Sequence, residues 1–284
     1  MVVNAPTTAD EKILYTFTTY PYLTGEQITR LLYSKGSAHY VSAKIKTLTQ
    51  QKLLHRLDRE TINFPYVYCL GSRGIRYLRT RGSDIPQFHP SEHTTHKPMF
   101  LRHTLAVTDF LIAAATLPAT IPGVTVNDIK HDLTLKRTQT MVVPDGWIDF
   151  RLNETTQVCL WLEMDMGTMD QKPFRKKISS LIDFSQQSYE QVFGTPSLTI
   201  VIATPTGERR LNNMLNWTQK ELIDSHSEQD ADLFRFLCIS EQEMCPEQVF
   251  CSPICHRPFA PGRMALIQCE QERMKIQKVT DKIY

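Results

Sequence analysis

The order of apolar segments between residues 101 and 203 restricts the folds open to this chain. Runs with the length and composition of helices alternate there with shorter runs typical of strands. We expect helices over residues 101–116 and 170–191, and strands over residues 129–137, 141–152, 157–164 and 197–203. The predicted order is therefore helix, three strands, helix and strand, an α/β arrangement.

Three acidic residues stand at the ends of two of these strands. Glu163 and Asp165 are two residues apart, so they project from the same side of a strand. If the strand that carries Asp145 lies alongside, its carboxylate joins them. Gathered carboxylates suit Mg²⁺ or Mn²⁺, which activates water and offsets charge on a scissile phosphate. The pattern predicts a phosphodiester site, intact or relic, with Asp145, Glu163 and Asp165 as catalytic acids and metal ligands.

This element order resembles the core of the PD-(D/E)xK nuclease-like superfamily. The resemblance matches Asp145 to the family's aspartate and Glu163 to its second acid. At the next position the chain has an anion, Asp165, where the family has a lysine. The resemblance allows the lysine to come from the following helix, and Lys177 is our choice because it precedes the apolar stripe that should seat this helix on the sheet. Turn, strand-end and helix-cap chemistry is the alternative explanation for the acids.

Charge is distributed unevenly along the chain. The first 100 residues hold 13 Lys and Arg against 7 Asp and Glu, a net of +6, whereas the remainder holds 19 against 23, a net of −4. This asymmetry indicates a basic N-terminal part that faces nucleic acid. A chain of 284 residues is long enough for two domains. We expect a DNA-binding domain over residues 1–82, a proline- and histidine-containing linker over 83–100, and a nuclease-like domain with a C-terminal extension over 101–284.

The N-terminal part has the pattern of a winged helix-turn-helix. Expected helices cover residues 8–20, 25–33 and 37–51, two strands cover 53–57 and 66–70 around a polar turn, and a fourth helix begins at Ser72. The third helix stands where a recognition helix is expected. A small helical module that binds protein is the alternative.

Candidate DNA contacts follow from this assignment. They are Tyr40, Lys44 and Lys46 on the third helix, Arg56 beside the wing, Arg73, Arg76 and Arg79 on the fourth helix, and Arg209 and Arg210 near the acids. Arginine pairs with phosphate through a rigid fork, which favours these positions. Ordinary solvated charges are the alternative at each.

Seven cysteines, with neither a signal peptide nor an apolar run of transmembrane length, favour free thiols in a reducing cytoplasm. Cys245, Cys251, Cys255 and His256 lie close in sequence, but their spacing is not that of a standard zinc module. We therefore expect no zinc. The histidines at 89, 93 and 96 are expected to be simply exposed, and residues 264–284 are expected to form a helix of mixed charge that serves as a docking or a dimerising element.

Several motifs together resemble the replication-relaxation family over roughly residues 8–240. They are the winged-helix pattern, His-Thr-Leu-Ala-Val at 103–107, Val-Pro-Asp-Gly at 143–146, Glu-x-Asp-x-Gly-Thr at 163–168, the lysine-bearing helix and the Arg209-Arg210 pair. The resemblance implies duplex DNA binding in plasmid replication, relaxation or transfer, with other mobile-element proteins as partners and no membrane. Two classes stay open, namely a non-catalytic DNA-binding adaptor and an endonuclease dependent on Mg²⁺ or Mn²⁺.

Overall fold

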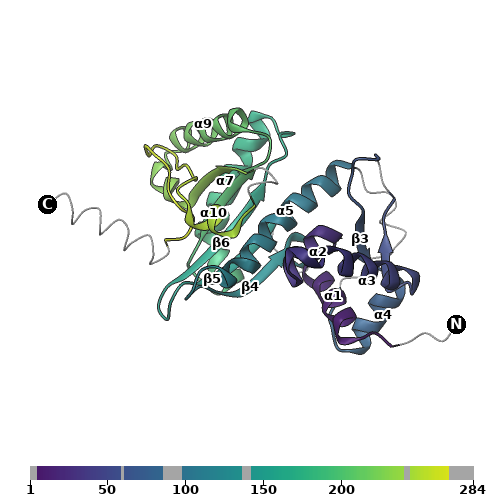
Figure 1. Ribbon diagram of the computed structural model, residues 1–284. Helices are drawn as coiled ribbons and strands as arrows, with labels where there is room; N and C mark the ends of the chain where they lie inside the picture. The colour runs from purple at the N-terminus through teal and green to yellow at the C-terminus, as the bar shows by residue number, and fades with distance from the viewer. Residues whose placement is uncertain (1–4, 59–60, 86–97, 136–141, 240–243, 269–284) are drawn as a thin grey trace. The chain divides into compact units, whose positions relative to one another are not determined.

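The computed structural model describes residues 5–58, 61–85, 98–135, 142–239 and 244–268. The chain forms two compact units, residues 1–112 and 113–284, and each is described by itself. Both mix helices with a β-sheet, so the fold is α+β (Figure 1).

The first unit contains four helices and a small sheet before a long helix begins. Its elements are α1 (Thr8–Thr19), β1 (Leu23–Thr24), α2 (Gly25–Leu32), η1 (Lys35–Ser37), α3 (Ala38–Gln50), β2 (Leu54–Arg56), β3 (Val67–Leu70) and α4 (Ser72–Thr80), followed by α5 (Pro98–Thr116). The sheet has the order β1-β3-β2, and all its pairs are antiparallel. Each helix and strand predicted here is present, with bounds that differ by a few residues.

Local sequence explains where the first helices begin. Thr7 and Thr24 are the N-caps of α1 and α2, and each forms a capping box with the residue three positions later, Asp10 or Gln27. Helix α4 approaches the β2 strand closely because residue 74 is glycine. A Cβ atom there would lie 2.1 Å from the carbonyl oxygen of Leu53. A larger residue would therefore push α4 away from the sheet.

Most of α5 belongs to the first unit, because the division falls between Ile112 and Ala113. The Gln27 amide donates to the Leu105 carbonyl oxygen at 3.1 Å and to Asp109 Oδ1 at 3.0 Å. Arg30 forms an ion pair with Asp109. The sequence placed a linker over residues 83–100, but residues 98–100 are helical in the structure. Residues 86–97, with their three histidines, lie outside the described residues.

The second unit is built on a five-stranded mixed sheet. Its elements are η3 (Leu117–Ala119), β4 (Thr125–His131), α6 (Asp132–Leu135), β5 (Gly146–Arg151), β6 (Gln157–Met164), α7 (Gln171–Gln187), α8 (Tyr189–Phe193), β7 (Thr199–Thr204), α9 (Glu208–Asp224), η4 (Glu228–Leu233), β8 (Phe234–Cys238) and α10 (Pro246–Cys251). The strand order is β4-β5-β6-β7-β8, antiparallel from β4 to β6 and parallel from β6 to β8.

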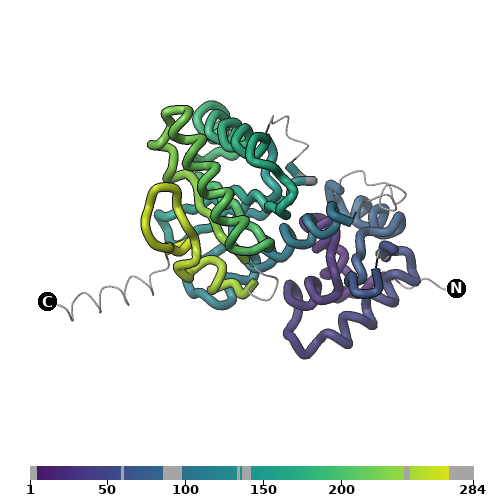
Figure 2. Tube along the Cα trace, turned by 90° about the horizontal axis from the view of Figure 1, so that it is seen from above, coloured from purple at the N-terminus to yellow at the C-terminus, as the bar shows by residue number. Residues whose placement is uncertain are grey.

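Helices α7 and α9 lie side by side over one face of this sheet (Figures 1 and 2). The core between them contains Trp161 of β6, Ile200 and Ile202 of β7, Phe234 and Phe236 of β8, and Phe174, Ile178, Leu181, Leu211, Met214 and Leu222 of the two helices. On the other face, Phe150 of β5 meets Phe250 of α10 edge to face, with ring centroids 5.3 Å apart. Burial of these side chains holds the ends of β5 and β6 in fixed positions.

Three predicted bounds in this unit were wrong. The strand expected over 129–137 covers Thr125–His131 and is followed by α6, while residues 136–141 lie outside the described residues. The strand expected over 141–152 begins at Gly146, since Pro144 has no N–H group for a sheet ladder. The helix expected over 170–191 is broken at Ser188, where the Tyr189 side chain turns inward and its hydroxyl donates to the Ser197 carbonyl oxygen at 2.7 Å.

Helix α5 and the turn after it, Pro98–Ala119, are long and apolar enough to cross a membrane by length and composition alone, with a mean hydropathy of 1.3. In the structure 61% of that segment is buried. A helix at the core of a globular protein passes the same test, and this burial is typical of one.

Candidate functional site

Asp145 and Glu163 lie side by side at one end of the second unit's sheet. Gly146 pairs with Leu162 in the β5–β6 ladder, so the preceding Asp145 comes next to Glu163. The Asp145 N–H donates to the Leu162 carbonyl oxygen at 3.0 Å, and Asp145 Oδ2 accepts from the Met164 N–H at 2.7 Å. The backbone of β6 therefore fixes the Asp145 carboxylate beside the second acid.

Glu163 is buried, with 4% of its surface exposed. Its Oε1 accepts a hydrogen bond from the Trp161 indole N–H at 2.6 Å. Burial raises the pKa of Glu163 above its ordinary value of 4.5; Lys177 opposes this rise and Asp145 adds to it. Sequence reasoning missed Trp161, although its position two residues before Glu163 on one strand is a usable signal.

Lys177 of α7 forms an ion pair with Glu163 Oε2. Burial lowers the pKa of Lys177, but attraction to Glu163 and Asp145 exceeds that effect, so the pKa lies above its ordinary value and the ammonium group stays protonated. Of the three lysines at the start of α7, Lys172 and Lys176 are exposed and form no ion pair among the described residues. The structure thus brings together Asp145, Glu163 and Lys177.

Asp165 has a different partner. Arg210, in the first turn of α9, donates from Nε to Asp165 Oδ1 at 2.7 Å and from Nη2 to Oδ2 at 2.8 Å. Arg210 also donates to the Met169 carbonyl oxygen at 2.6 Å and lies over the Trp217 ring, 5.0 Å from its centroid. This fork occupies both oxygens of Asp165, and it turns Arg210 inward, away from the role of a DNA contact.

These contacts decide how well a divalent metal fits. Asp145 and Glu163 offer hard oxygen ligands, and Mg²⁺ is commonly held by one or two carboxylates with water and phosphate oxygens completing its shell. Both oxygens of Asp165 already accept hydrogen bonds from Arg210, which competes with a metal for this carboxylate. Within the described part of the chain, no three His, Cys, Asp or Glu side chains form a group able to hold a metal. The residues therefore fit a two-carboxylate site and not the three-acid site expected from the sequence.

A further acid beside Asp145 was not expected from the sequence. The Asp132 N–H donates to the Asp145 carbonyl oxygen at 3.0 Å, and Asp132 Oδ1 lies 2.5 Å from Nδ1 of the buried His131. The sequence predicted a strand up to residue 137, whereas β4 ends at His131, so Asp132 lies at the end of the sheet. Nothing in the sequence pattern marks that strand end.

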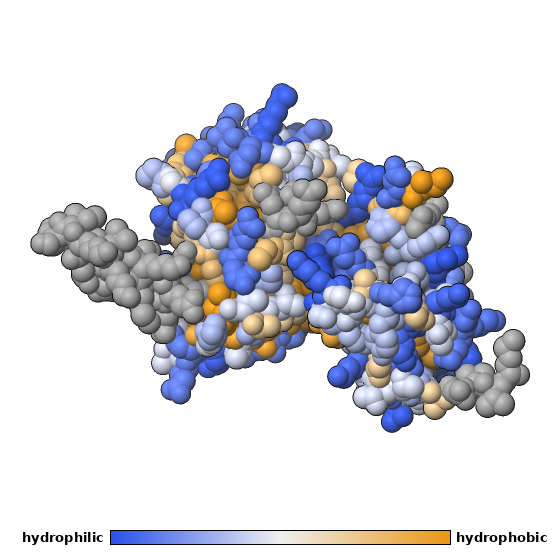
Figure 3. Space-filling view, in the orientation of Figure 1, coloured by the Kyte–Doolittle hydropathy of each residue, from blue (hydrophilic) through white to orange (hydrophobic). Residues whose placement is uncertain are grey.

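In the first unit, α3 presents one continuous polar face to solvent. Val41, Ile45 and Leu48 are buried. The opposite face carries six exposed residues at helical spacing, namely His39, Ser42, Ala43, Lys46, Thr47 and Gln50. Hydrophilic residues predominate over α3 and α4 in the view of Figure 3. Tyr40 is 45% exposed and packs edge to face on Tyr33.

Lys44 does not share that polar face. Its ammonium group lies 3.0 Å from Asp10 Oδ1 and 3.3 Å from Thr7 Oγ1, so it belongs to the cap of α1. Burial raises the pKa of Asp10, but hydrogen bonds from Thr7 and Lys44 outweigh it and leave the pKa below its ordinary value. The structure gives Lys44 an internal partner, whereas Lys46 is exposed.

The arginine candidates for DNA contact also divide into exposed side chains and side chains with an internal partner. Arg56 is exposed and stacks on Tyr66 across the β2–β3 hairpin, 4.7 Å from the ring centroid. Arg73 donates to the Gln51 carbonyl oxygen at 3.0 Å. Arg76 and Arg79 on α4 and Arg209 on α9 are exposed. The arginines with solvent-facing side chains are the ones available to an outside partner.

The clustered cysteines do not share a common centre. Cys251 and Cys255 are buried, and Cys245 is exposed with its thiol 3.0 Å from Glu247. Burial raises the pKa of Cys255 to about 12, so this thiol stays protonated. Cys269 and the predicted tail helix lie outside the described residues, except for residues 264–268.

Comparison with known proteins gives a family. Residues 17–195, more than half of the chain, match the sequence model of the replication-relaxation family. The chain belongs to the replication-relaxation family. The family that the sequence motifs predicted is thereby confirmed, and the match covers Asp145, Glu163 and Lys177.

Two other comparisons add little. No curated protein matches the chain. Among solved structures, the restriction endonuclease FokI matches with 11% sequence identity and a TM-score of 0.30, over 85% of this chain and 44% of that one. The chain thus spans less than half of the length of FokI, and a TM-score of 0.30 does not establish a common fold.

Proposed function

We propose that this replication-relaxation protein binds duplex DNA through its first unit and acts in the replication, relaxation or transfer of a bacterial plasmid or mobile element. The observation that carries the proposal is the exposed polar face of α3, defined by His39, Ser42, Lys46, Thr47 and Gln50. These side chains offer donors and acceptors of the kind that read base edges, and one of them is a cation.

The order of elements supports the same interpretation. Helix α3 follows α2 closely and is followed at once by the β2–β3 hairpin, which is the order of a winged helix-turn-helix. In that class the second helix of the pair enters the major groove and the flanking elements contact the backbone. Arg56 on the hairpin and Arg76 and Arg79 on α4 are exposed cations suited to phosphate contacts.

Direct titration tests the proposal. The whole chain is expected to bind a fluorescent duplex with an affinity that falls as salt rises, because phosphate contacts release counterions. Lys46→Gln should weaken binding on every sequence and reduce the slope of log affinity against log salt by about 0.9. Lys12→Gln is the matched control, since Lys12 is an exposed lysine on α1. Equal affinities for Lys46→Gln and the unchanged chain would remove α3 from the interface.

A second candidate function is favoured by one observation, the contact between Lys177 and Glu163 beside Asp145. An aspartate, a glutamate and a lysine are the group that a PD-(D/E)xK-like endonuclease needs. A Mg²⁺ or Mn²⁺ ion held by Asp145 and Glu163 would supply a bound hydroxide and offset phosphate charge. Lys177 would hold a positive charge against the phosphate.

Nicking of supercoiled plasmid with either ion tests the endonuclease. Asp145→Asn and Glu163→Gln should each abolish nicking, while Asp183→Asn, an exposed acid on α7, should not. Nicking that survives both site variants would come from a contaminant. In either case we propose a cytoplasmic protein without structural zinc, and elemental analysis returning one zinc per chain would contradict that part.

A further inference from the structure

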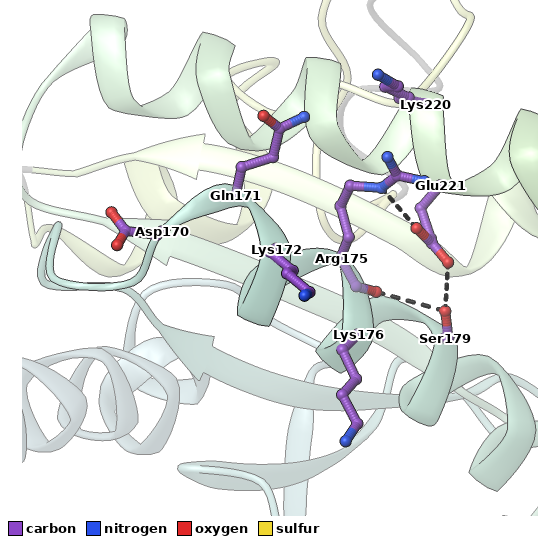
Figure 4. A pocket seen from close by; sticks show the side chains of 8 residues that line it. All are labelled: Asp170, Gln171, Lys172, Arg175, Lys176, Ser179, Lys220 and Glu221. Atoms are coloured by element: carbon purple, nitrogen blue, oxygen red, sulfur yellow. Dashed lines mark hydrogen bonds and ion pairs between the residues drawn. The ribbon is translucent and has the colours of Figure 1, made fainter.

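Helices α7 and α9 form a pocket of about 640 Å³ on the second unit, and it is not part of the acid–lysine site (Figure 4). Lys172, Arg175, Lys176 and Ser179 line it from α7, and Lys220 and Glu221 line it from α9. Lys177, next in sequence to Lys176, turns instead to Glu163. Successive residues on a helix point about 100° apart, so α7 serves two separate places.

The floor of the pocket is formed by Arg175, Ser179 and Glu221, whose polar groups bind one another. Arg175 donates from Nε to Glu221 Oε2 at 2.6 Å and from Nη2 to Asp224 at 2.6 Å. The Ser179 hydroxyl donates to Glu221 Oε1 at 2.5 Å. Both oxygens of Glu221 are therefore used inside the protein. Glu221 is therefore already bound to a cation, Arg175.

The rim of the pocket carries more positive than negative charge. Lys172, Lys176 and Lys220 are exposed, and no ion pair within the described residues engages any of them. Asp170 is the acid at the rim, and its charge also acts on Arg210. Three lysines against one acid leave the rim positive. A concave polar surface with this charge attracts an anion.

The arrangement of the lysines favours a long anion over a small one. Figure 4 shows Lys220 and Lys176 on opposite sides of the Arg175–Glu221 pair, with their ammonium groups pointing apart. Lys172 and Lys176 are four residues apart on α7, so their Cβ atoms are about 5–6 Å from each other. Cations spread along a surface contact successive charges of a polymer, whereas a single phosphate needs converging donors.

We propose that this pocket is a second DNA contact, which holds backbone phosphates through Lys172, Lys176 and Lys220. The inference rests on the proposed DNA-binding function and deepens it, because it gives the second unit a share in affinity without any role in cleavage. Contacts of this kind carry no sequence information. They add affinity that depends on salt and is equal on all sequences.

The test compares two triple variants of the whole chain on a fluorescent duplex of about 60 base pairs at several salt concentrations. One variant changes Lys172, Lys176 and Lys220 to Gln. The control changes Lys130, Arg151 and Arg257 to Gln, which removes the same formal charge from the same unit, although Lys130 and Arg257 are ion-paired with Asp128 and Asp232. The pocket variant should reduce the slope of log affinity against log salt by about 2 to 3, since each phosphate contact contributes about 0.9, and the control should reduce it far less.

Equal slopes for the two triple variants would overturn the pocket, because the effect would then be one of net charge alone. Melting temperatures should stay near that of the unchanged chain, since the three lysines are exposed. Failure of the pocket is distinguishable from failure of the proposed function. In the first case Lys46→Gln still weakens binding, and in the second the unchanged chain itself does not bind the duplex, which refutes both.

Discussion

The two units treat their charges in opposite ways. In the first unit Lys46, Arg76 and Arg79 face solvent. At the sheet end of the second unit, Glu163 is paired with Lys177 and Asp165 with Arg210. The first arrangement leaves charge available to an outside partner, whereas the second uses it to hold the fold together. An exposed, unpaired charge is therefore the more direct sign of a binding surface, whereas a paired charge contributes first to the fold.

The largest effect is expected from Lys177→Met. This change leaves Glu163 buried and uncompensated, which should lower the free energy of unfolding by about 3 kcal/mol, the low end for a broken buried pair because the Lys177 side chain is 35% exposed. Urea denaturation measures it. Lys176→Met, one residue away and exposed, is the control, and adding Glu163→Gln to Lys177→Met should recover most of the loss. A fully stable Lys177→Met protein would mean that the lysine is free to act on a substrate.

Arg210→Lys should be less costly, at about 2 kcal/mol, because the charge is kept while the fork to Asp165 and the bond to the Met169 carbonyl oxygen are lost. Arg209→Lys, at an exposed position of the same turn, should leave stability unchanged. Urea denaturation of the two variants measures this difference in stability. If Arg210→Lys instead keeps its stability and weakens DNA binding, Arg210 is the DNA contact that the sequence predicted.

The pH dependence of stability tests the burial of Glu163. Its pKa in the folded state is raised by burial, so the folded state binds a proton more tightly than the unfolded state does. This contribution is present below the ordinary pKa of 4.5 and is lost as the pH rises through the raised value. The unchanged chain should therefore gain stability relative to Glu163→Gln as the pH falls from neutral toward 4.5. If the stability of the two proteins changes equally with pH, the Glu163 carboxyl group is solvated and burial does not raise its pKa.

The smallest effect concerns Lys44. Its pair with Asp10 is partly exposed, at 24% and 12% of the two side chains, so Lys44→Gln should lower the free energy of unfolding by about 0.5 to 1 kcal/mol. DNA affinity should stay unchanged. Lys46→Gln should do the reverse, with lower affinity and unchanged stability. Equal losses of DNA affinity for the two variants would mean that Lys44 and Lys46 contribute equally to DNA binding, which contradicts the assignment of Lys44 to the cap of α1.

Sequence patterns predicted the elements well and the charge pairs poorly. Strand β6 and helix α3 follow from the spacing of their apolar residues, which is a local signal. The sequence placed Asp145 beside Glu163 only on the condition that their strands are neighbours, and the β5–β6 pairing meets that condition. The partners of Asp165 and Lys44 did not, because Arg210 is 45 residues away and Asp10 is 34 residues away. Pairs this distant depend on packing, which no local pattern records.

Helix α5 has a consequence for how this protein can be divided or recombined. Gln27 caps α2 and also binds Leu105 and Asp109, so the first unit is completed by residues well beyond its own small sheet. A fragment that ends at residue 85 would leave the Gln27 amide and the Arg30 guanidinium exposed to water. Exchange of the second half between relatives should therefore take place after the end of α5 at Thr116, so that Leu105 and Asp109 stay with Gln27 and Arg30.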